Sequence, residues 1–281
     1  MARKPPTFGS PRRSRDNPRD RALAYHAAMK TNGKLAGTAA IVTGSAKNIG
    51  RVIALYLAEE GAAIVVNGLS DKPAAQAVAG EIEAAGGRAV VQMGDVTRES
   101  DATALAEACV SAFGRLDFLV CNPAIRKQTP FLEMSLEEWH RVLAVPLDGA
   151  FLTAKAAVPH MIRGGRGGAI VTLGGVSAFL GTPGRAHVCA AKAGLIGLTH
   201  ALAMELAEHN IRVNCVAPGA IDTVRGTSAG TRPTGMGAHR APLGRLGRSE
   251  EIAAIVRQLC LPDGAYITGQ TIHVNGGVFL S

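Results

Sequence analysis

The chain has 281 residues, of which 47% are hydrophobic, 19% charged and 4% aromatic. This composition can bury a sizeable core, and so few aromatic residues argue against a surface on which nucleic-acid bases stack. The net charge is +8, but residues 1–34 carry nine Lys and Arg against two Asp, whereas the rest of the chain carries 21 Lys and Arg against 20 Asp and Glu. The positive charge therefore lies in the N-terminal segment and does not indicate a nucleic-acid or membrane partner for the body of the protein. We expect a basic N-terminal extension over residues 1–34 and one domain over residues 35–281.

The extension itself divides into two parts. Residues 1–16 are rich in Pro and Arg and offer little to bury, so we expect disorder. Asn17 and Pro18 then provide the N-cap and the first residue of a short helix that ends near Gly33. The chain has no uninterrupted apolar run of ~18 residues and no secretory signal, and its five cysteines form no C-x-x-C pair. We therefore predict a cytoplasmic protein with no metal site, membrane or nucleic-acid partner.

From residue 39 onward, short β-branched runs alternate with longer patterns of helical period. This alternation is typical of βαβ units, which build a parallel sheet with helices on both faces. We predict a doubly wound, three-layer α/β/α fold of the Rossmann type with seven strands. Their expected ranges are residues 39–43, 63–67, 89–93, 118–121, 169–173, 212–216 and 272–274.

Two of the connecting segments are informative. The segment before the sixth strand carries an apolar stripe at steps of three or four residues, which predicts a helix facing the core. Residues 224–248 hold six Gly and five Arg without an acidic residue, and a loop of this length favours a lid over a substrate cleft, with a flexible surface loop as the alternative. The stripe consists of Ala191, Leu195, Leu198, Leu202 and Leu206.

The first strand runs into a glycine-containing turn, IVTGSAKNIGR over residues 41–51. Backbone amides at the start of the following helix, together with its dipole, favour a bound pyrophosphate. A strand before, a helix after and a second strand ending at Asn67 give the turn the context of a dinucleotide site, and an ordinary glycine turn is the alternative. The loop residues that would contact a cofactor are Gly44, Ser45, Lys47, Asn48, Ile49 and Gly50.

The end of the second strand distinguishes NAD from NADP. NAD enzymes place a carboxylate there against the ribose hydroxyls, but here Asn67 is followed by no acid until Asp71. A 2′-phosphate would meet no repulsion, and Lys47 would pair with it. We predict NADP, with NAD as the alternative.

At this point the chain resembles the short-chain dehydrogenase/reductase family over residues 35–281. The loop resembles the family's T-G-x-x-x-G-x-G motif, residues 95–96 its adenine-binding pair, and CNPA at 121–124 a degraded N-N-A-G. RVNCVAPGAIDT at 212–223 and VNGG at 274–277 resemble its two later motifs. The resemblance implies further cofactor contacts from Asp95, Val96, Asn122, Lys192, Pro218, Gly219, Ile221 and Thr223.

The departures from the family's pattern fall on its chemistry. Members carry a Tyr four residues before a Lys, a Ser thirteen residues before that Tyr, and an Asn on the preceding long helix. Lys192 is present, but the other three positions hold Val188, Gly175 and Pro146. Losing a general acid costs about 10² to 10⁴ in rate and losing an oxyanion donor about 10² to 10³. The resemblance therefore implies that ordinary family catalysis is crippled.

Two of these departures also affect the backbone. Pro146 removes a donor inside a segment of helical pattern, so we expect a bent helix there. Asn48 stands at the middle glycine of the phosphate loop, where Asn tolerates left-handed geometry better than most residues, but it leaves less room for the pyrophosphate.

Several side chains are candidates to replace the missing groups. Lys192 lies one helical turn after Val188 and would reach the ribose hydroxyls, or act as a base. His187 has the imidazole side chain that commonly serves as an acid, but it is rotated by ~100° from Val188, so a helix-start or interface histidine is the alternative. Cys189, Asp148 and Tyr25 are weaker candidates.

The sequence as a whole predicts an NADP-binding oxidoreductase for a small carbonyl or alcohol, with Lys192 and His187 as its catalytic residues. The alternatives are a non-redox lyase or isomerase in the same cleft, or a catalytically silent cofactor-binding subunit. The resemblance also implies a homo-oligomer, a tetramer or a dimer, and the Ala-rich helical segments are compatible with it. The identity of the small-molecule substrate is not readable from the sequence.

Overall fold

The computed structural model of the protein describes residues 33–224 and 241–280. Its centre is a seven-stranded sheet in the order β3-β2-β1-β4-β5-β6-β7, in which every pair is parallel. The predicted doubly wound fold is confirmed, and each strand lies within two residues of its expected bounds. The strands are β1 Ala39–Val42, β2 Ala63–Val66, β3 Ala89–Val91, β4 Phe118–Cys121, β5 Gly168–Leu173, β6 Ile211–Pro218 and β7 Thr271–Val274.

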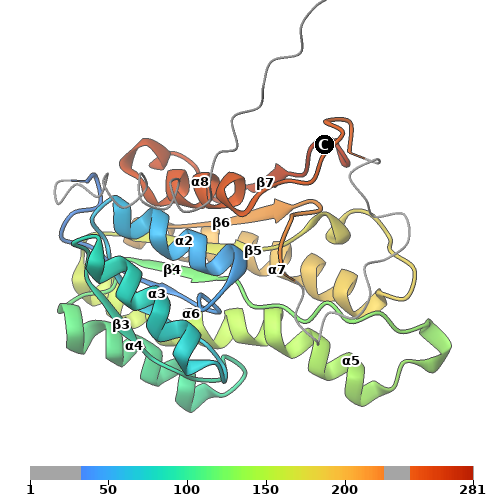
Figure 1. Ribbon diagram of the computed structural model, residues 1–281, viewed down its shortest axis with the longest axis horizontal. Coiled ribbons are helices and arrows are strands. Elements are labelled where there is room, and N and C mark those ends of the chain that lie inside the picture. The colour runs from blue at the N-terminus through green and yellow to red at the C-terminus, as the bar shows by residue number, and fades with distance from the viewer. Residues whose placement is uncertain (1–32, 225–240, 281) are drawn as a thin grey trace, which may run out of the picture.

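Helices cover both faces of this sheet (Figure 1). One apolar cluster joins the sheet to α2, α3 and α8, and a second joins it to α4, α6 and α7, so the molecule has three layers. The α-helices are α2 Asn48–Glu59, α3 Lys72–Ala84, α4 Glu99–Phe113, α5 Leu136–Leu143, α6 Gly149–Gly164, α7 Ala186–Glu205 and α8 Ser249–Cys260.

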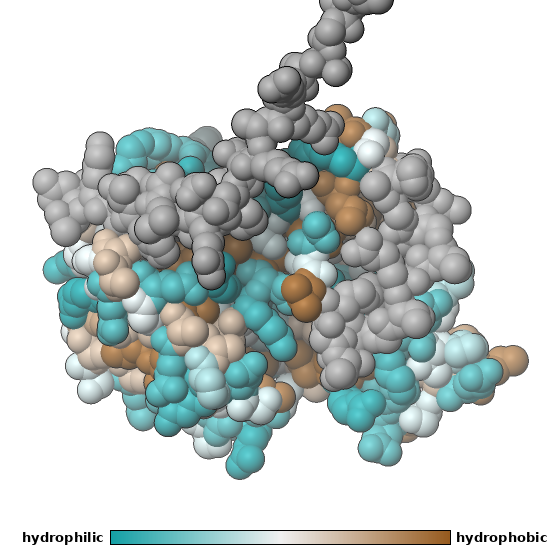
Figure 2. Space-filling model, viewed as in Figure 1, coloured by the Kyte–Doolittle hydropathy of each residue, from teal (hydrophilic) through white to brown (hydrophobic). Residues whose placement is uncertain are grey.

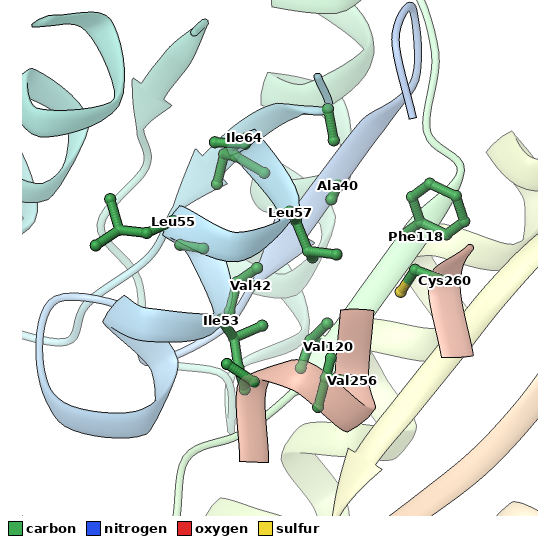
Figure 3. Packing of buried hydrophobic residues seen from close by; sticks show 14 of the residues in the cluster. Ala40, Val42, Ile53, Leu55, Leu57, Ile64, Phe118, Val120, Val256 and Cys260 are labelled. Carbon is green, nitrogen blue, oxygen red and sulfur yellow. The ribbon is translucent and has the colours of Figure 1, made fainter. Parts of the chain in front are cut away.

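The strands carry hydrophobic residues on both faces of the sheet because helices cover both faces. Figure 3 shows the first cluster, where Ile53 of α2 and Val256 of α8 pack over Val42 and Val120 of the central strands. All four side chains are at most 9% exposed. The predicted stripe on α7 faces the second cluster, with Leu195 and Leu206 buried and Leu198 and Leu202 partly buried.

The expected disturbance at Pro146 takes the form of a π-helical turn. This turn, η2 Ala144–Asp148, joins α5 to α6 without a break. Proline lacks the N–H that an α-helical bond would need at this position, and a wider turn accommodates it. Pro146 is buried, whereas Asp148 at the end of the turn is exposed.

Two helical stretches, Leu136–Gly164 and Ala186–Glu205, are long and apolar enough to cross a membrane by length and composition. Both pack against the sheet, and the core helix of a globular domain meets the same two criteria.

Some predictions lie outside the described residues. These are the basic extension up to residue 32 with its short helix and Tyr25, and the greater part of the expected lid, residues 225–240.

Candidate cofactor and substrate cleft

Because all seven strands are parallel, their carboxyl ends share one edge of the sheet. The strand order reverses between β1 and β4, and a ligand crevice forms at such a switch point. The segments that follow β1, β2, β4, β5 and β6 therefore surround one place, and most of the predicted site residues lie in them.

The phosphate loop, defined here as residues 43–50, requires glycine at two positions. A Cβ atom on Gly50 would lie 2.4 Å from the carbonyl oxygen of Gly44 and 2.7 Å from Nδ2 of Asn122. Gly44 has a φ of +61° and faces Asn122 and Pro123. Helix α2 begins at Asn48, with the exposed Lys47 as its N-cap residue. Glycine thus lets the loop backbone lie close to β4, with the helix N-terminus at the crevice.

Asn67 at the end of β2 is buried, and its side chain is fully bonded to backbone groups. Its Oδ1 accepts from the N–H of Gly44 at 3.0 Å, and its Nδ2 donates to the carbonyls of Gln92 and Gly94. Ser45 is buried too, with its Oγ bonded to Val42 and to the N–H of Asn67. Both residues were predicted to contact the cofactor, but their polar atoms hold the loop to β2 and β3.

Asn122 performs the same task from β4. Its Nδ2 donates to the carbonyl oxygens of Thr43 at 3.1 Å and Gly44 at 3.0 Å, and its N–H donates to Oγ1 of Thr43. The loop is therefore tied to the strands on both sides of β1, and its shape is set before any ligand binds.

Asn48 adopts the left-handed conformation with a φ of +52°. Its amide makes two bonds to the backbone of Val224, with Nδ2 donating to the carbonyl at 2.9 Å and Oδ1 accepting from the N–H at 3.1 Å. The side chain of Asn48 thus joins the phosphate loop to the segment that follows β6.

The remaining predicted cofactor residues sit at the ends of β3 and β6. Asp95 accepts from the N–H and hydroxyl of Thr97, while Val96 is buried against Gly149 of α6. Gly219 donates to Val274, and a Cβ on it would lie 2.7 Å from Cα of Asn275. Ile221 pairs with Gly247 in an isolated bridge, and Ile49, Pro218 and Thr223 are partly buried.

Lys192 of α7 is 7% exposed, and its Nζ donates to the carbonyl oxygen of Leu173 at the end of β5. Burial lowers the pKa of Lys192 to about 8, and the positive charge of Arg126 adds to this effect. An ammonium group with such a pKa gives up its proton near neutral pH far more readily than an exposed lysine.

His187 lies away from this group. It is fully buried, its Nδ1 accepts from the N–H of Val188 at 2.9 Å, and its Nε2 lies 3.2 Å from Oε1 of Glu138 on α5. Since Nδ1 accepts, the ring proton is on Nε2 and faces the carboxylate. Nε2 joins α7 to α5 and Nδ1 is bonded within α7, which leaves no ring proton for the cleft.

Glu138 is the centre of that buried cluster. It also accepts from Lys127 and Thr129, in the segment that follows β4. Bonds from Lys127, then from Thr129, lower the pKa of Glu138 to about 2, with a smaller contribution from His187. No sequence pattern indicated this role, because an acid on an amphipathic helix predicts a solvated face.

The remaining positions singled out from the sequence are Val188 and Cys189 at the start of α7 and Gly175 just after β5. Val188 is buried with an apolar side chain, and Cys189 is partly buried. Gly175 has an extended backbone, and a Cβ on it would meet no atom closer than 3.6 Å. In residues 33–224 and 241–280, no three His, Cys, Asp or Glu side chains come together as a metal site would require.

A cavity of about 600 Å³ opens beside the end of β6, between α8 and residues 273–280. Its wall includes the rings of His273 and Phe279, whose centroids are 4.9 Å apart. Phe179, just beyond β5, stacks on Phe279 at 4.7 Å and meets His273 edge-on at 4.6 Å. The cavity is therefore bordered by aromatic rings on the side of β5.

Comparisons with known proteins agree with this geometry. The family model described as enoyl-(acyl carrier protein) reductase matches residues 44–279. The chain is 41% identical over 241 residues to the 3-oxoacyl-(acyl-carrier-protein) reductase of Staphylococcus aureus, covering 86% of this chain and 98% of that protein. It is 39% identical over 247 residues to the protein of that name from Synechocystis, covering 88% and 98%.

Solved structures give the same result. A short-chain type dehydrogenase/reductase from Mycobacterium marinum superposes with a TM-score of 0.81 at 34% identity, covering 92% of this chain and 99% of that chain. An acetoin dehydrogenase from Enterobacter cloacae superposes with a TM-score of 0.79 at 40% identity, covering 86% and 95%.

Proposed function

Since the chain belongs to the short-chain dehydrogenase/reductase family, we propose that it is an oxidoreductase that uses NADP(H) to interconvert a small carbonyl compound and its alcohol. The observation that carries this proposal is the phosphate loop. Gly44 and Gly50 leave it open beside the start of α2, while Asn67 and Asn122 hold it in shape. Such a prearranged set of backbone groups binds a diphosphate without first having to be ordered.

The preference for NADP rests on charge at the end of β2. Lys47 is exposed at the N-cap of α2, where it would pair with a 2′-phosphate. The nearest acid after β2 is Asp71, whose Oδ1 accepts from the N–H of Ala74 and caps α3. No carboxylate is thus provided for ribose hydroxyls, and NAD is the lesser alternative.

We propose Lys192 as the residue that moves the proton. A bound nicotinamide would supply or accept the hydride. The negative charge that develops on the carbonyl oxygen then needs a proton donor, and Val188 offers none. Nζ of Lys192 contacts the end of β5, and burial lowers the pKa of this residue to about 8. Its ammonium group would protonate that oxygen directly or through one water molecule.

The use of Lys192 as the proton donor departs from the family's pattern and leads us to expect slow turnover. Val188, Gly175 and Pro146 stand where members carry Tyr, Ser and Asn. We propose that turnover is slower by about 10² to 10⁴ than with a tyrosine acid. Proteins named for reduction of a 3-oxoacyl thioester and for acetoin oxidation are among the relatives, so a small ketone or its alcohol is the proposed substrate class.

We also propose that the active protein is a cytoplasmic homo-oligomer, a tetramer or a dimer, whose domain covers residues 35–281. The segment before α5 projects from the body (Figure 1), and Figure 2 shows hydrophobic residues at its tip. Leu132 is 96% exposed there, and Phe131, Leu136 and Phe151 are also exposed. An exposed apolar group of this kind is typical of a protein interface. The five cysteines are free, as expected in a reducing compartment.

The test has two steps. NADPH is first titrated into the purified protein, with cofactor fluorescence and thermal shift as readouts. Acetoacetyl-coenzyme A, 2,3-butanedione and acetoin are then offered as substrates, with nicotinamide absorbance followed over time. Saturable binding followed by slow turnover of one of them supports the proposal. No binding at millimolar NADPH or NADH overturns it.

The same experiment separates the two alternatives. Binding without turnover of any of these compounds would favour a silent cofactor-binding subunit. Consumption of a compound without any change in nicotinamide absorbance would favour a lyase or isomerase that uses Lys192.

A further inference from the structure

The end of β5 contains two consecutive glycines that differ in the space around them. A Cβ on Gly174 would lie 2.6 Å from Sγ of the buried Cys215, so glycine is required there. A Cβ on Gly175 would have ordinary van der Waals contacts, the nearest to Oγ of Ser177 at 3.6 Å and the next to the carbonyl of Pro218 at 3.9 Å. The space next to Gly175 therefore already borders a hydroxyl group.

That hydroxyl is held on a rigid turn. Ser177 is the middle residue of η3, Val176–Ala178, which packs against α7. Backbone bonds from Ala178 to Gly175 at 3.0 Å and from Leu180 to Val176 at 2.9 Å fix the turn, and Val176 is buried beneath it. Ser177 itself is partly exposed, and its Oγ makes no hydrogen bond within the described part of the chain. A hydroxyl in this setting is free to bind a ligand.

The turn is also at the right edge of the sheet. Lys192 donates to the carbonyl of Leu173, two residues before Gly175. Phe179, two residues after Ser177, stacks on Phe279 in the wall of the 600 Å³ cavity. Ser177 thus lies in the chain between the lysine's anchor and the aromatic rings at the cavity.

We infer that Ser177 is a catalytic residue whose hydroxyl hydrogen-bonds the carbonyl oxygen of the substrate. The inference rests on the proposed oxidoreductase function. In the reduction, the carbonyl carbon gains a hydride as NADPH is oxidised to NADP⁺, and the oxygen gains a proton from Lys192. Ser177 keeps its own proton and stabilises the charge that develops on the oxygen, as an oxyanion donor does. Lys192 regains its proton from solvent.

The first arm of the test uses the natural site, with NADPH and acetoacetyl-coenzyme A as probes. Ser177→Ala should lower kcat by about 10²-fold while NADPH binding and the melting temperature stay unchanged. Ser177→Thr keeps the hydroxyl and should retain part of the activity. Ser111→Ala, which removes an exposed hydroxyl on α4, is the matched control and should turn over like the wild type.

The second arm does not depend on the natural rate. Val188→Tyr introduces a phenol one helical turn before Lys192 and should raise turnover without any change at Gly175. Adding Ser177→Ala should abolish that gain, and adding Gly175→Ser as well should restore it, because the space at Gly175 accepts a side chain. Thermal melts and NADPH titrations identify any variant that fails to fold.

The outcomes separate this inference from the proposed function. Turnover that is unaffected by Ser177→Ala in both backgrounds overturns the role of Ser177 and leaves the oxidoreductase standing. Activity that appears in Val188→Tyr only when Gly175→Ser is present overturns it too. If all variants, including Val188→Tyr with Gly175→Ser, fold and bind NADPH but none reduces a carbonyl, both the role of Ser177 and the proposed oxidoreductase function are overturned.

Discussion

The phosphate loop (residues 43–50) and the β5–α7 wall (residues 173–192) lie at the same edge of the sheet but differ in what their polar groups do. Around the loop, the side-chain amides of Asn67 and Asn122 are bonded to backbone groups. In the wall, within residues 33–224 and 241–280, the hydroxyl of Ser177 has no hydrogen-bond partner and Nζ of Lys192 makes one hydrogen bond, to Leu173. One region is built to keep its shape, and the other holds groups that remain available for chemistry.

This difference indicates which positions can be substituted without loss of the fold. A substitution in the loop disturbs a network that joins β1, β2 and β4, and thus affects both stability and binding. A substitution of Ser177 or Lys192 in the wall removes one group that few others depend on. We therefore expect wall variants to lose turnover while remaining folded, and loop variants to lose stability and cofactor together.

The largest effect is expected for Lys192→Met. Turnover should fall by about 10² to 10⁴, whereas the free energy of unfolding at pH 7 should rise by about 1–3 kcal/mol, because an apolar side chain replaces a buried charge. Steady-state kinetics and urea unfolding measure the two changes. A variant that is both inactive and strongly destabilised would contradict the expectation that wall variants lose turnover while remaining folded.

Lys192 also predicts a pH dependence. Its pKa is about 8 in the folded protein and 10.5 in the unfolded chain, so between these values the unfolded chain holds a proton that the folded chain has released. The contribution of Lys192 to the free energy of unfolding therefore increases between pH 8 and pH 10.5. Reductase turnover should fall as the pH rises through about 8, because Lys192 then loses the proton it donates. Lys192→Met should remove this pH-dependent contribution to the free energy of unfolding. If the variant and the wild type show the same pH dependence of unfolding, the assignment to Lys192 is refuted.

The loop is tested by Gly50→Ala against Gly80→Ala. The first adds a methyl group 2.4 Å from the carbonyl of Gly44, and the second adds one on α3 with no atom within 4 Å. We expect Gly50→Ala to lower the free energy of unfolding by about 1–3 kcal/mol and to abolish NADPH binding. Gly80→Ala should stabilise by about 0.5–1 kcal/mol and bind normally. Equal effects of the two would show that the loop is not closely packed.

A further pair of variants tests whether the contacts of Glu138 hold the β5–α7 wall in place. Glu138→Gln weakens the buried bonds to Lys127 and His187 and should cost about 1–3 kcal/mol, whereas Glu137→Gln, next to it but exposed, should cost less than about 0.5 kcal/mol. Thermal unfolding at pH 7 compares them. Near-equal melting temperatures would mean that the cluster does not support α7.

The smallest effect is expected where the loop contacts the segment that follows β6. Asn48→Gly keeps a left-handed turn but releases the backbone of Val224. We expect a change of less than about 1 kcal/mol in unfolding and an NADPH affinity that rises a few-fold, measured by calorimetry. Asn210→Gly makes the same change at a φ of +56° beyond α7 and should leave affinity unaltered. A lower affinity in Asn48→Gly would show that the side chain assists binding.

The sequence predicted the fold well because its signals are local. Runs such as residues 63–66 are apolar on both faces and are followed by turns, and Leu195 and Leu206 fall on one helical stripe. The disturbance at Pro146 was foreseen for the same reason. The bonds of Asn67 and the pairing of His187 with Glu138, 49 residues apart, depend on tertiary packing, and no local pattern encodes them. Ser177 was missed because only the folded turn brings its Oγ beside Gly175.

A crystal structure of the protein grown with excess NADPH tests the central claim most directly. The account predicts that the diphosphate lies against the backbone N–H groups of residues 46–50, with the 2′-phosphate near Lys47. Density for the nucleotide in the cavity beside β6, or a loop still closed by its own side chains at saturating NADPH, would contradict it.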